Sequence, residues 1–163
     1  MVEAGPADRS EELEGAVPDS QKVWFTWLTV VTLGVIVFGL FLLTAPMLAR
    51  QWFSVLVYSS SDRITDFGPE AVAYIELAHA VMGAVMVGWG VALLLVLRGP
   101  MRRDLMQGLA IFGISLLAWF IPDTLFSVIS GFWENGAQNL VFAVLFAIPL
   151  IALYRQARRA RPT

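Results

Sequence analysis

The sequence AVAYIELAHAVMGAVMVGWGVALLLVL, residues 71–97, decides the fold of this chain. It is long enough to cross a bilayer, because about 20 apolar residues in an α-helix span the hydrocarbon core. It nevertheless carries an acid, Glu76, and the single histidine of the chain, His79, in its first third. The stretch therefore predicts a membrane-spanning helix with ionisable groups close to one of its ends.

The composition of the whole chain agrees with a membrane location. Of 163 residues, 58% are hydrophobic and 15% are charged, and the mean hydropathy is +0.70. Soluble domains contain about 45–50% apolar and about 25% charged residues. The chain has no cysteine, which excludes disulfides, thiolate metal sites, iron–sulfur clusters and cysteine nucleophiles.

Four apolar segments predict the fold class, an all-α integral membrane protein built as a four-transmembrane-helix bundle. The predicted spans are residues 23–45, 71–97, 105–131 and 132–154. They form one membrane domain, residues 22–155. Residues 47–58 mix apolar and polar side chains, and we predict a short helix that lies in the membrane interface. Pro122 removes a backbone donor inside the third span and predicts a kink or an early helix end there.

The two ends of the chain carry opposite charge. Residues 1–21 contain six acidic side chains and one arginine together with glycines and prolines, a composition typical of a disordered acidic arm. Residues 156–163 form a basic tail.

The distribution of arginine predicts the orientation in the membrane. Three arginines lie between the second and third spans and four follow the fourth span, whereas the regions 46–70 and 131–136 contain only Arg50 and Arg63. Because positive residues mark the cytoplasmic side, both termini are predicted to be cytoplasmic. We expect the membrane to be a bacterial-type cytoplasmic membrane.

A ridge of mostly small residues follows the second span. Glu76, Ala80, Ala84, Gly88 and Ala92 recur every four residues, a step that drifts by only about 40° in an α-helix. Small residues in such a ridge allow another helix to approach closely. The ridge predicts a close helix contact within the bundle, or contact with a membrane-protein partner or a second copy of the chain.

The predicted topology brings the buried polar residues to one half of the membrane. These residues are Glu76, His79, Asp123, Glu134, Asn135, Gln138 and Asn139. Ionisable groups inside a membrane cost at least about 2.5–3.5 kcal/mol each, so they are seldom present without a role. We predict an outward-facing polar ligand pocket between the second, third and fourth spans. Two alternatives stay open: a hydrogen-bond network that only holds the helices together, and placement of Glu134 and Asn135 among lipid headgroups.

Metal chemistry at this pocket is restricted by the histidine count. Glu76-x-x-His79 resembles one half of the di-iron carboxylate motif, but a di-metal site of that kind needs a second such pair. A single metal held by Glu76, His79 and either Asp123 or Glu134 stays open, as does one axial bond from His79 to a tetrapyrrole. The sequence leaves the cofactor undefined.

The predicted function is that of a non-catalytic membrane protein. No serine-nucleophile elbow or phosphate-cradling loop occurs in the sequence, and nothing in it indicates nucleic-acid binding. We expect an accessory, scaffold or sensor subunit that uses the polar pocket. The alternative is a small proton-coupled transporter or a metal-dependent membrane enzyme that uses Glu76, His79 and Asp123.

Overall fold

The computed structural model describes residues 19–159, and this part of the chain is helical and contains no strand. Its elements are α2 (Asp19–Thr44), α3 (Pro46–Tyr58), the 3-10 helix η1 (Arg63–Phe67), α4 (Pro69–Arg98), α5 (Pro100–Arg103), α6 (Leu105–Ile129) and α7 (Trp133–Arg159). Four segments are long and apolar enough to cross a membrane, one each from α2, α6 and α7 and one from α4 together with α5. The prediction of an all-helical fold with four helices long and apolar enough to span a membrane is thus confirmed. Most of the predicted acidic arm and the last residues of the basic tail lie outside the described residues.

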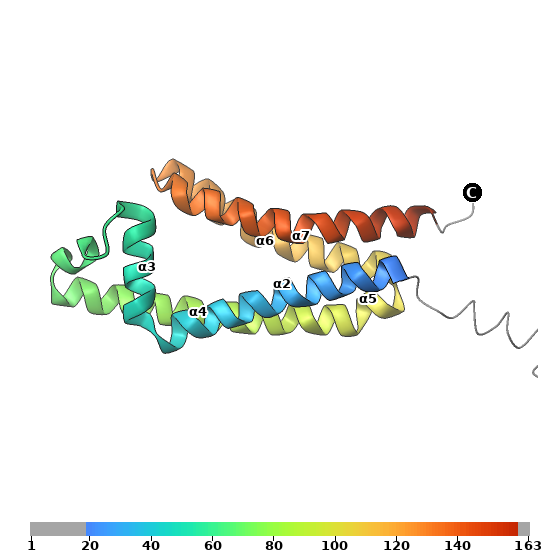
Figure 1. Cartoon of the computed structure of the whole chain (residues 1–163), viewed down its shortest axis with the longest axis horizontal. Helices are drawn as coiled ribbons and strands as arrows, with labels where there is room; N and C mark the ends of the chain where they lie inside the picture. The colour runs from blue at the N-terminus through green and yellow to red at the C-terminus, as the bar shows by residue number, and fades with distance from the viewer. Residues whose placement is uncertain (1–18, 160–163) are drawn as a thin grey trace, which may run out of the picture.

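The long helices form two hairpins that run along the same axis (Figure 1). Helices α2 and α4 lie side by side in the first hairpin, and α6 and α7 form the second. At one end α3 stands across the direction of the long helices and contacts α2, α4 and α7. The start of α2 and the end of α7 lie at the opposite end of the bundle from α3.

Glycines allow α2 and α4 to touch through their backbones. A Cβ atom on Gly39 would lie 2.8 Å from the carbonyl oxygen of Gly83, and one on Gly83 would lie 2.7 Å from the backbone nitrogen of Leu43. Further along α4, a Cβ on Gly90 would lie 2.5 Å from Cγ1 of Ile36. These distances are too short for a side chain, so close packing of the first hairpin requires glycine at these positions.

Most of the small-residue ridge does not make this contact, and the prediction is wrong for Ala84, Gly88 and Ala92, which do not pack against another helix of the chain. Ala84, Gly88 and Ala92 are exposed, and a Cβ on Gly88 would have no atom within 4 Å. The helix contact uses Gly83 and Gly90 instead, which lie on a different face of α4 because successive residues rotate by about 100°. Small residues lie on both of these faces of α4, so their spacing alone could not predict which face packs against α2.

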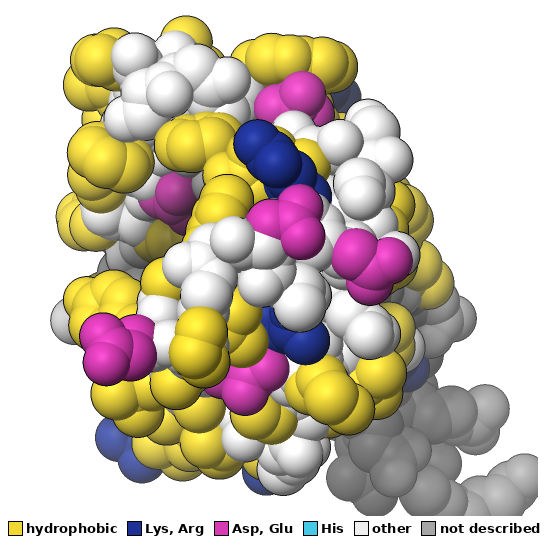
Figure 2. Space-filling view, turned by 90° about the vertical axis from the view of Figure 1, so that its left-hand side faces the viewer, with side chains coloured by type: hydrophobic (Ala, Val, Ile, Leu, Met, Phe, Trp, Pro, Cys, Tyr) yellow, Lys and Arg dark blue, Asp and Glu magenta, His cyan; other side chains and the backbone are white. Residues whose placement is uncertain are grey.

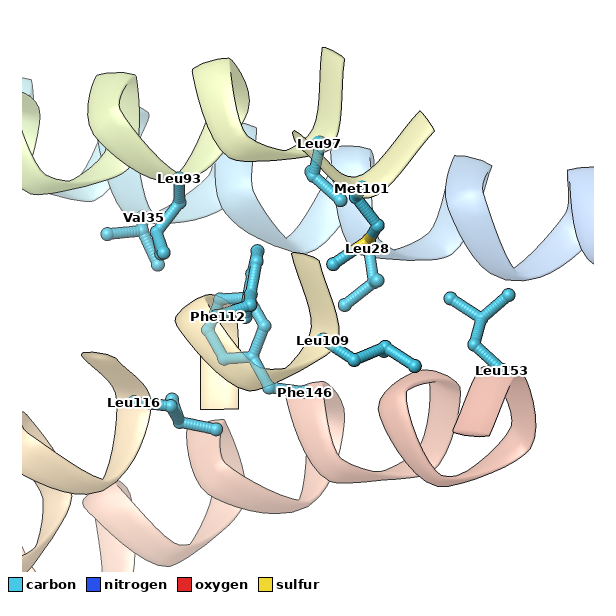
Figure 3. Packing of buried hydrophobic residues seen from close by; sticks show 10 residues of the cluster. All are labelled: Leu28, Val35, Leu93, Leu97, Met101, Leu109, Phe112, Leu116, Phe146 and Leu153. Carbon is cyan, nitrogen blue, oxygen red and sulfur yellow. The ribbon is translucent and has the colours of Figure 1, made fainter. Parts of the chain in front are cut away.

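The hydrophobic core lies between the two hairpins (Figure 3). Its members are Leu28 and Val35 from α2, Leu93 and Leu97 from α4, Met101 from α5, Leu109, Phe112 and Leu116 from α6, and Phe146 and Leu153 from α7. Only 17–28% of the most apolar window of each span is buried inside the chain, so most of the apolar surface is left to contact lipid.

Two tryptophans hydrogen-bond across the hairpins. Nε1 of Trp27 donates to the carbonyl oxygen of Leu145 at 3.0 Å, which joins α2 to α7. Nε1 of Trp89 donates to Oγ of Ser115 at 2.7 Å, which joins α4 to α6. A hydrogen bond between helices satisfies an indole N–H that lipid could not satisfy.

The helix boundaries correct one detail of the sequence interpretation, and the short helix makes contacts that the sequence did not predict. Helix α6 continues through Pro122 to Ile129, so the early helix end is not observed. The short helix after the first span is present as α3, but its polar residues Arg50 and Ser54 are buried against protein. Oγ of Ser54 donates to the carbonyl oxygen of Ser60 at 2.5 Å and thereby holds the loop that leads to η1.

Candidate functional site

The residues predicted to form one pocket divide into two polar clusters at the α3 end of the bundle. Figure 2 looks onto this end and shows acidic and basic side chains interspersed among hydrophobic ones. One cluster connects α3, η1 and α4 around Glu76, and the other connects α6 and α7 around Asp123.

Glu76 is paired with an arginine from the short helix. Nε of Arg50 donates to Oε1 of Glu76 at 3.0 Å, and Nη1 of Arg50 donates to Oγ1 of Thr65 at 2.5 Å. The side chains of Arg50 and Glu76 are only 9% and 30% exposed. Such a charge-assisted hydrogen bond neutralises both groups and fixes α3 and η1 against α4. We call Arg50, Thr65 and Glu76 the Arg50 cluster.

His79 is buried one turn further along α4 and packs against an aromatic ring. The centres of the His79 and Phe53 rings are 4.7 Å apart, with 33° between the ring planes. In the part of the chain that the structure describes, Nδ1 of His79 has no hydrogen-bond partner. The contact with Phe53 attaches the middle of α3 to α4, next to the Arg50 cluster.

In the second cluster, amide side chains of α7 donate hydrogen bonds to side chains of α6. Nδ2 of Asn135 donates to Oδ1 of Asp123 at 3.2 Å and to Oγ of Ser127 at 2.8 Å. The Ser127 hydroxyl donates to the carbonyl oxygen of Asp123 at 2.7 Å. Nδ2 of Asn139 donates to Oγ1 of Thr124 at 3.4 Å. We call Asp123, Thr124, Ser127, Asn135 and Asn139 the Asp123 cluster.

A cavity of about 100 Å³ lies between the two hairpins and is bounded by side chains of α2, α3, α4, α6 and α7. Its polar lining comes from Asp123, Asn135, Gln138 and Asn139. Its aromatic lining comes from Phe38, Phe53, Trp89, Trp119, Phe142 and Phe146. Small-molecule sites are typically concave and mainly apolar, with a few polar groups that point toward the ligand.

The structure therefore groups four of the seven predicted site residues around one cavity. Asp123, Asn135, Gln138 and Asn139 line it. Glu76 and His79 lie outside its lining, although Phe53 both packs on His79 and lines the cavity. Glu134 is half-buried at the start of α7 and does not line it either.

Sequence reasoning missed Arg50 and the aromatic walls. The signal for Arg50 was present, because Arg50 is the one cation of α3 and Glu76 is the one acid inside the apolar stretch 71–97, and opposite charges in neighbouring apolar segments predict an ion pair. Trp89 and Trp119, whose ring centres are 5.5 Å apart, carried no such signal. Aromatic residues are common in membrane helices and their contacts depend on how the hairpins dock.

The candidate metal set is not assembled among residues 19–159. No group of three His, Asp or Glu side chains there is arranged to hold a metal ion. Glu76 is engaged by Arg50, whereas Asp123 belongs to the other cluster. The described residues therefore do not bring Glu76, His79 and Asp123 together as a three-ligand set.

A larger groove of about 570 Å³ lies at the opposite end of the bundle, between the start of α2 and α5. It is lined by Lys22, Phe25 and Arg102 among others and contains none of the predicted site residues. The guanidinium of Arg102 lies over the Phe25 ring at 5.5 Å from its centre. The smaller cavity is lined by four of the predicted site residues, and we take it as the candidate site.

Comparisons with protein-family models, with curated proteins and with solved structures found no match to this chain.

Proposed function

We propose that this chain is a non-catalytic integral membrane protein, an accessory, scaffold or sensor subunit, that binds a small ligand in the cavity between α4, α6 and α7. The observation that carries the proposal is the convergence of Asp123, Asn135, Gln138 and Asn139 on an aromatic-walled cavity. If these polar groups only held the helices together, they would pair with one another and leave no cavity for a ligand. Here Asp123, Asn135 and Asn139 form hydrogen bonds and also line a cavity.

The pocket is proposed to open toward the outside of a bacterial-type cytoplasmic membrane. Arg98, Arg102, Arg103, Arg158 and Arg159 belong to the helix ends opposite α3. Arginine marks the cytoplasmic side, which assigns both termini to the inside. The short helix α3 then lies near the outer interface, with Phe53 directed to the cavity from that side.

A catalytic role is disfavoured by the contacts of the candidate nucleophile and base. The Ser127 hydroxyl donates to the backbone carbonyl four residues earlier, as serines in membrane helices commonly do. His79 is packed against Phe53 on another helix. Oγ of Ser127 also lies 3.4 Å from Oδ1 of Asp123, but this contact is longer than its 2.7 Å bond to the backbone carbonyl oxygen, and the same carboxylate oxygen accepts from Asn135.

The partner surface proposed for the accessory role is the small-residue ridge. In this ridge, Ala84, Gly88 and Ala92 are exposed on α4. A Cβ atom added to Gly88 would have no atom of the chain within 4 Å. A second copy or a partner helix could approach closely there.

A proton-coupled transporter is the second candidate, because Asp123 is a carboxylate within a membrane helix that forms no ion pair with any described residue. A carboxylate of this kind can exchange a proton for a cationic substrate. A transporter would move the ligand across the bilayer, whereas a sensor or accessory subunit would only hold it.

Purification in a mild detergent, followed by native mass spectrometry, tests the proposal. The wild-type protein should retain a small molecule, and Met86→Trp, which places a larger side chain in the cavity lining, should lose it. Val91→Trp on the lipid-exposed face of the same helix is the matched control and should retain it. The released compound, added back to protein in sealed vesicles, should be recovered unchanged and on the same side. Chemical conversion would establish an enzyme, and transfer across the bilayer would establish a transporter.

A further inference from the structure

We infer that the cavity between the hairpins binds a small organic ammonium ion, with the Asp123 carboxylate as its counter-ion. The inference rests on the proposed function, because it names the ligand class of the same pocket.

The side-chain hydrogen-bond donors next to Asp123 are already used within the protein. Both N–H groups of the Asn135 amide are used, toward Asp123 and Ser127. The amide nitrogen of Asn139 donates to Thr124. The Nε1 donor of Trp89 is used by Ser115. Gln138 also lines the cavity, and its amide offers both donors and an acceptor. Beside Asp123, however, the carboxylate and the amide oxygen of Asn135 are left to accept, so the part of a ligand that meets Asp123 has to be a donor.

The ligand that donates to Asp123 is expected to be positively charged, because no cation of the described residues is paired with this carboxylate. Asp123 forms no ion pair with any described residue. The cation on the adjacent α3, Arg50, is engaged by Glu76 and Thr65. The α2 residues that line the cavity, Val35 and Phe38, are apolar, as are the α4 residues Met82, Met86 and Trp89. A carboxylate in a membrane is stabilised strongly by a nearby positive charge, and here the ligand has to supply it.

The aromatic walls favour an organic ammonium over a strongly hydrated inorganic ion. Trp89 and Trp119 lie with ring centres 5.5 Å apart, and Phe38 and Phe142 with ring centres 6.3 Å apart. Both pairs line the cavity. Tryptophan faces attract cations, and the alkyl part of an amine gains apolar contact as well.

The size of the cavity restricts the ligand to a few carbon atoms. Its volume is about 100 Å³. An engineered apolar cavity of about 150 Å³ takes benzene, so a chain of about four carbons with one ammonium group is an appropriate probe.

The experiment compares n-butylammonium with n-butanol, which has a similar size and shape but no charge. Each is titrated into wild-type protein in nanodiscs of zwitterionic lipid at pH 7, and the tryptophan fluorescence is recorded. Hydrogen bonds to charged groups are typically strong enough for a preference of about tenfold or more, so the Kd of butylammonium should be lower than that of butanol by at least that factor. Asp123→Asn should bring the ratio close to one, and the distant Glu70→Gln should leave it unchanged.

The outcomes separate this inference from the proposed function. Equal affinities for both probes, both lost in Met86→Trp, would keep the pocket and overturn the cation inference. No saturable binding of either probe would overturn both. If Asp123→Asn does not fold, the two probes compared on wild-type protein still test the cation inference, because that comparison needs no variant at position 123.

Discussion

Nε of Arg50 lies 3.0 Å from Oε1 of Glu76, and this contact attaches the short helix α3 to the long helix α4. Each of the two charges would be costly alone in an apolar environment, and each is satisfied by the other. Thr65 accepts a second hydrogen bond from Arg50, so η1 is held by the same group. The position of α3 matters for the cavity, because Phe53 lies one turn after Arg50 and forms part of the wall.

Breaking this pair should destabilise the protein. Arg50→Gln and Glu76→Gln each leave a partly buried charge without its partner, and we expect a loss of about 1.5–3 kcal/mol, the usual range for a hydrogen bond to a charged group. Thermal unfolding of both single variants and the double variant in detergent gives the coupling energy by a double-mutant cycle. Arg63→Gln and Asp66→Asn form the control cycle, since that pair is 57% and 66% exposed and should couple weakly. Equal coupling in the two cycles would show that Arg50 does not anchor α3.

The backbone contact between α2 and α4 leads to a prediction about two glycines of the same helix. Gly83→Leu should prevent close packing, because even a Cβ at this position would lie 2.7 Å from the backbone nitrogen of Leu43. Gly88→Leu should be tolerated within the monomer, because a Cβ there meets nothing within 4 Å. Folded yield and melting temperature in detergent measure both effects. A folded, stable Gly83→Leu variant would contradict the packing of the first hairpin.

The sequence predicted the membrane fold well because its signals are local. Hydropathy over 71–97 and the other three spans depends only on neighbouring residues, and α4, Pro69–Arg98, extends the predicted span by a residue or two at each end. The contact face of α4 was missed for the opposite reason. Gly83 and Ala84 are adjacent small residues, and only the docking of α2 determines which of them is buried.

The candidate site was predicted in part for a similar reason. Asp123, Asn135, Gln138 and Asn139 lie on either side of one short turn, so the hairpin topology alone brings them together. Glu76 was expected in the same pocket because it lies at a similar depth. Depth does not fix the direction of a side chain, and the presence of α3 gives Glu76 a closer partner in Arg50.

Single cysteines test the proposed orientation of the helices, since the natural chain has none. Ser60→Cys lies in the exposed loop before η1, and Arg103→Cys lies in the exposed connection before α6. In intact cells a membrane-impermeant maleimide should label the first variant and not the second. After the membrane is permeabilised, both should react. Labelling of both variants in intact cells would contradict the four-span topology with cytoplasmic termini.

The final prediction separates the residues that hold α3 from those that line the cavity. The double variant Glu76→Gln/His79→Gln removes the partner of Arg50 and the ring that packs on Phe53. We expect it to melt at a lower temperature than wild type. Because neither side chain lines the cavity, its Kd for a bound ligand should change less than that of Asp123→Asn. Asp123→Asn keeps the size of the side chain and should change the melting temperature less than the double variant does. Melting curves and ligand titrations on the three proteins measure both quantities. If the double variant stayed as stable as wild type but lost its ligand, Glu76 and His79 would belong to the binding site and the division into two clusters would be wrong.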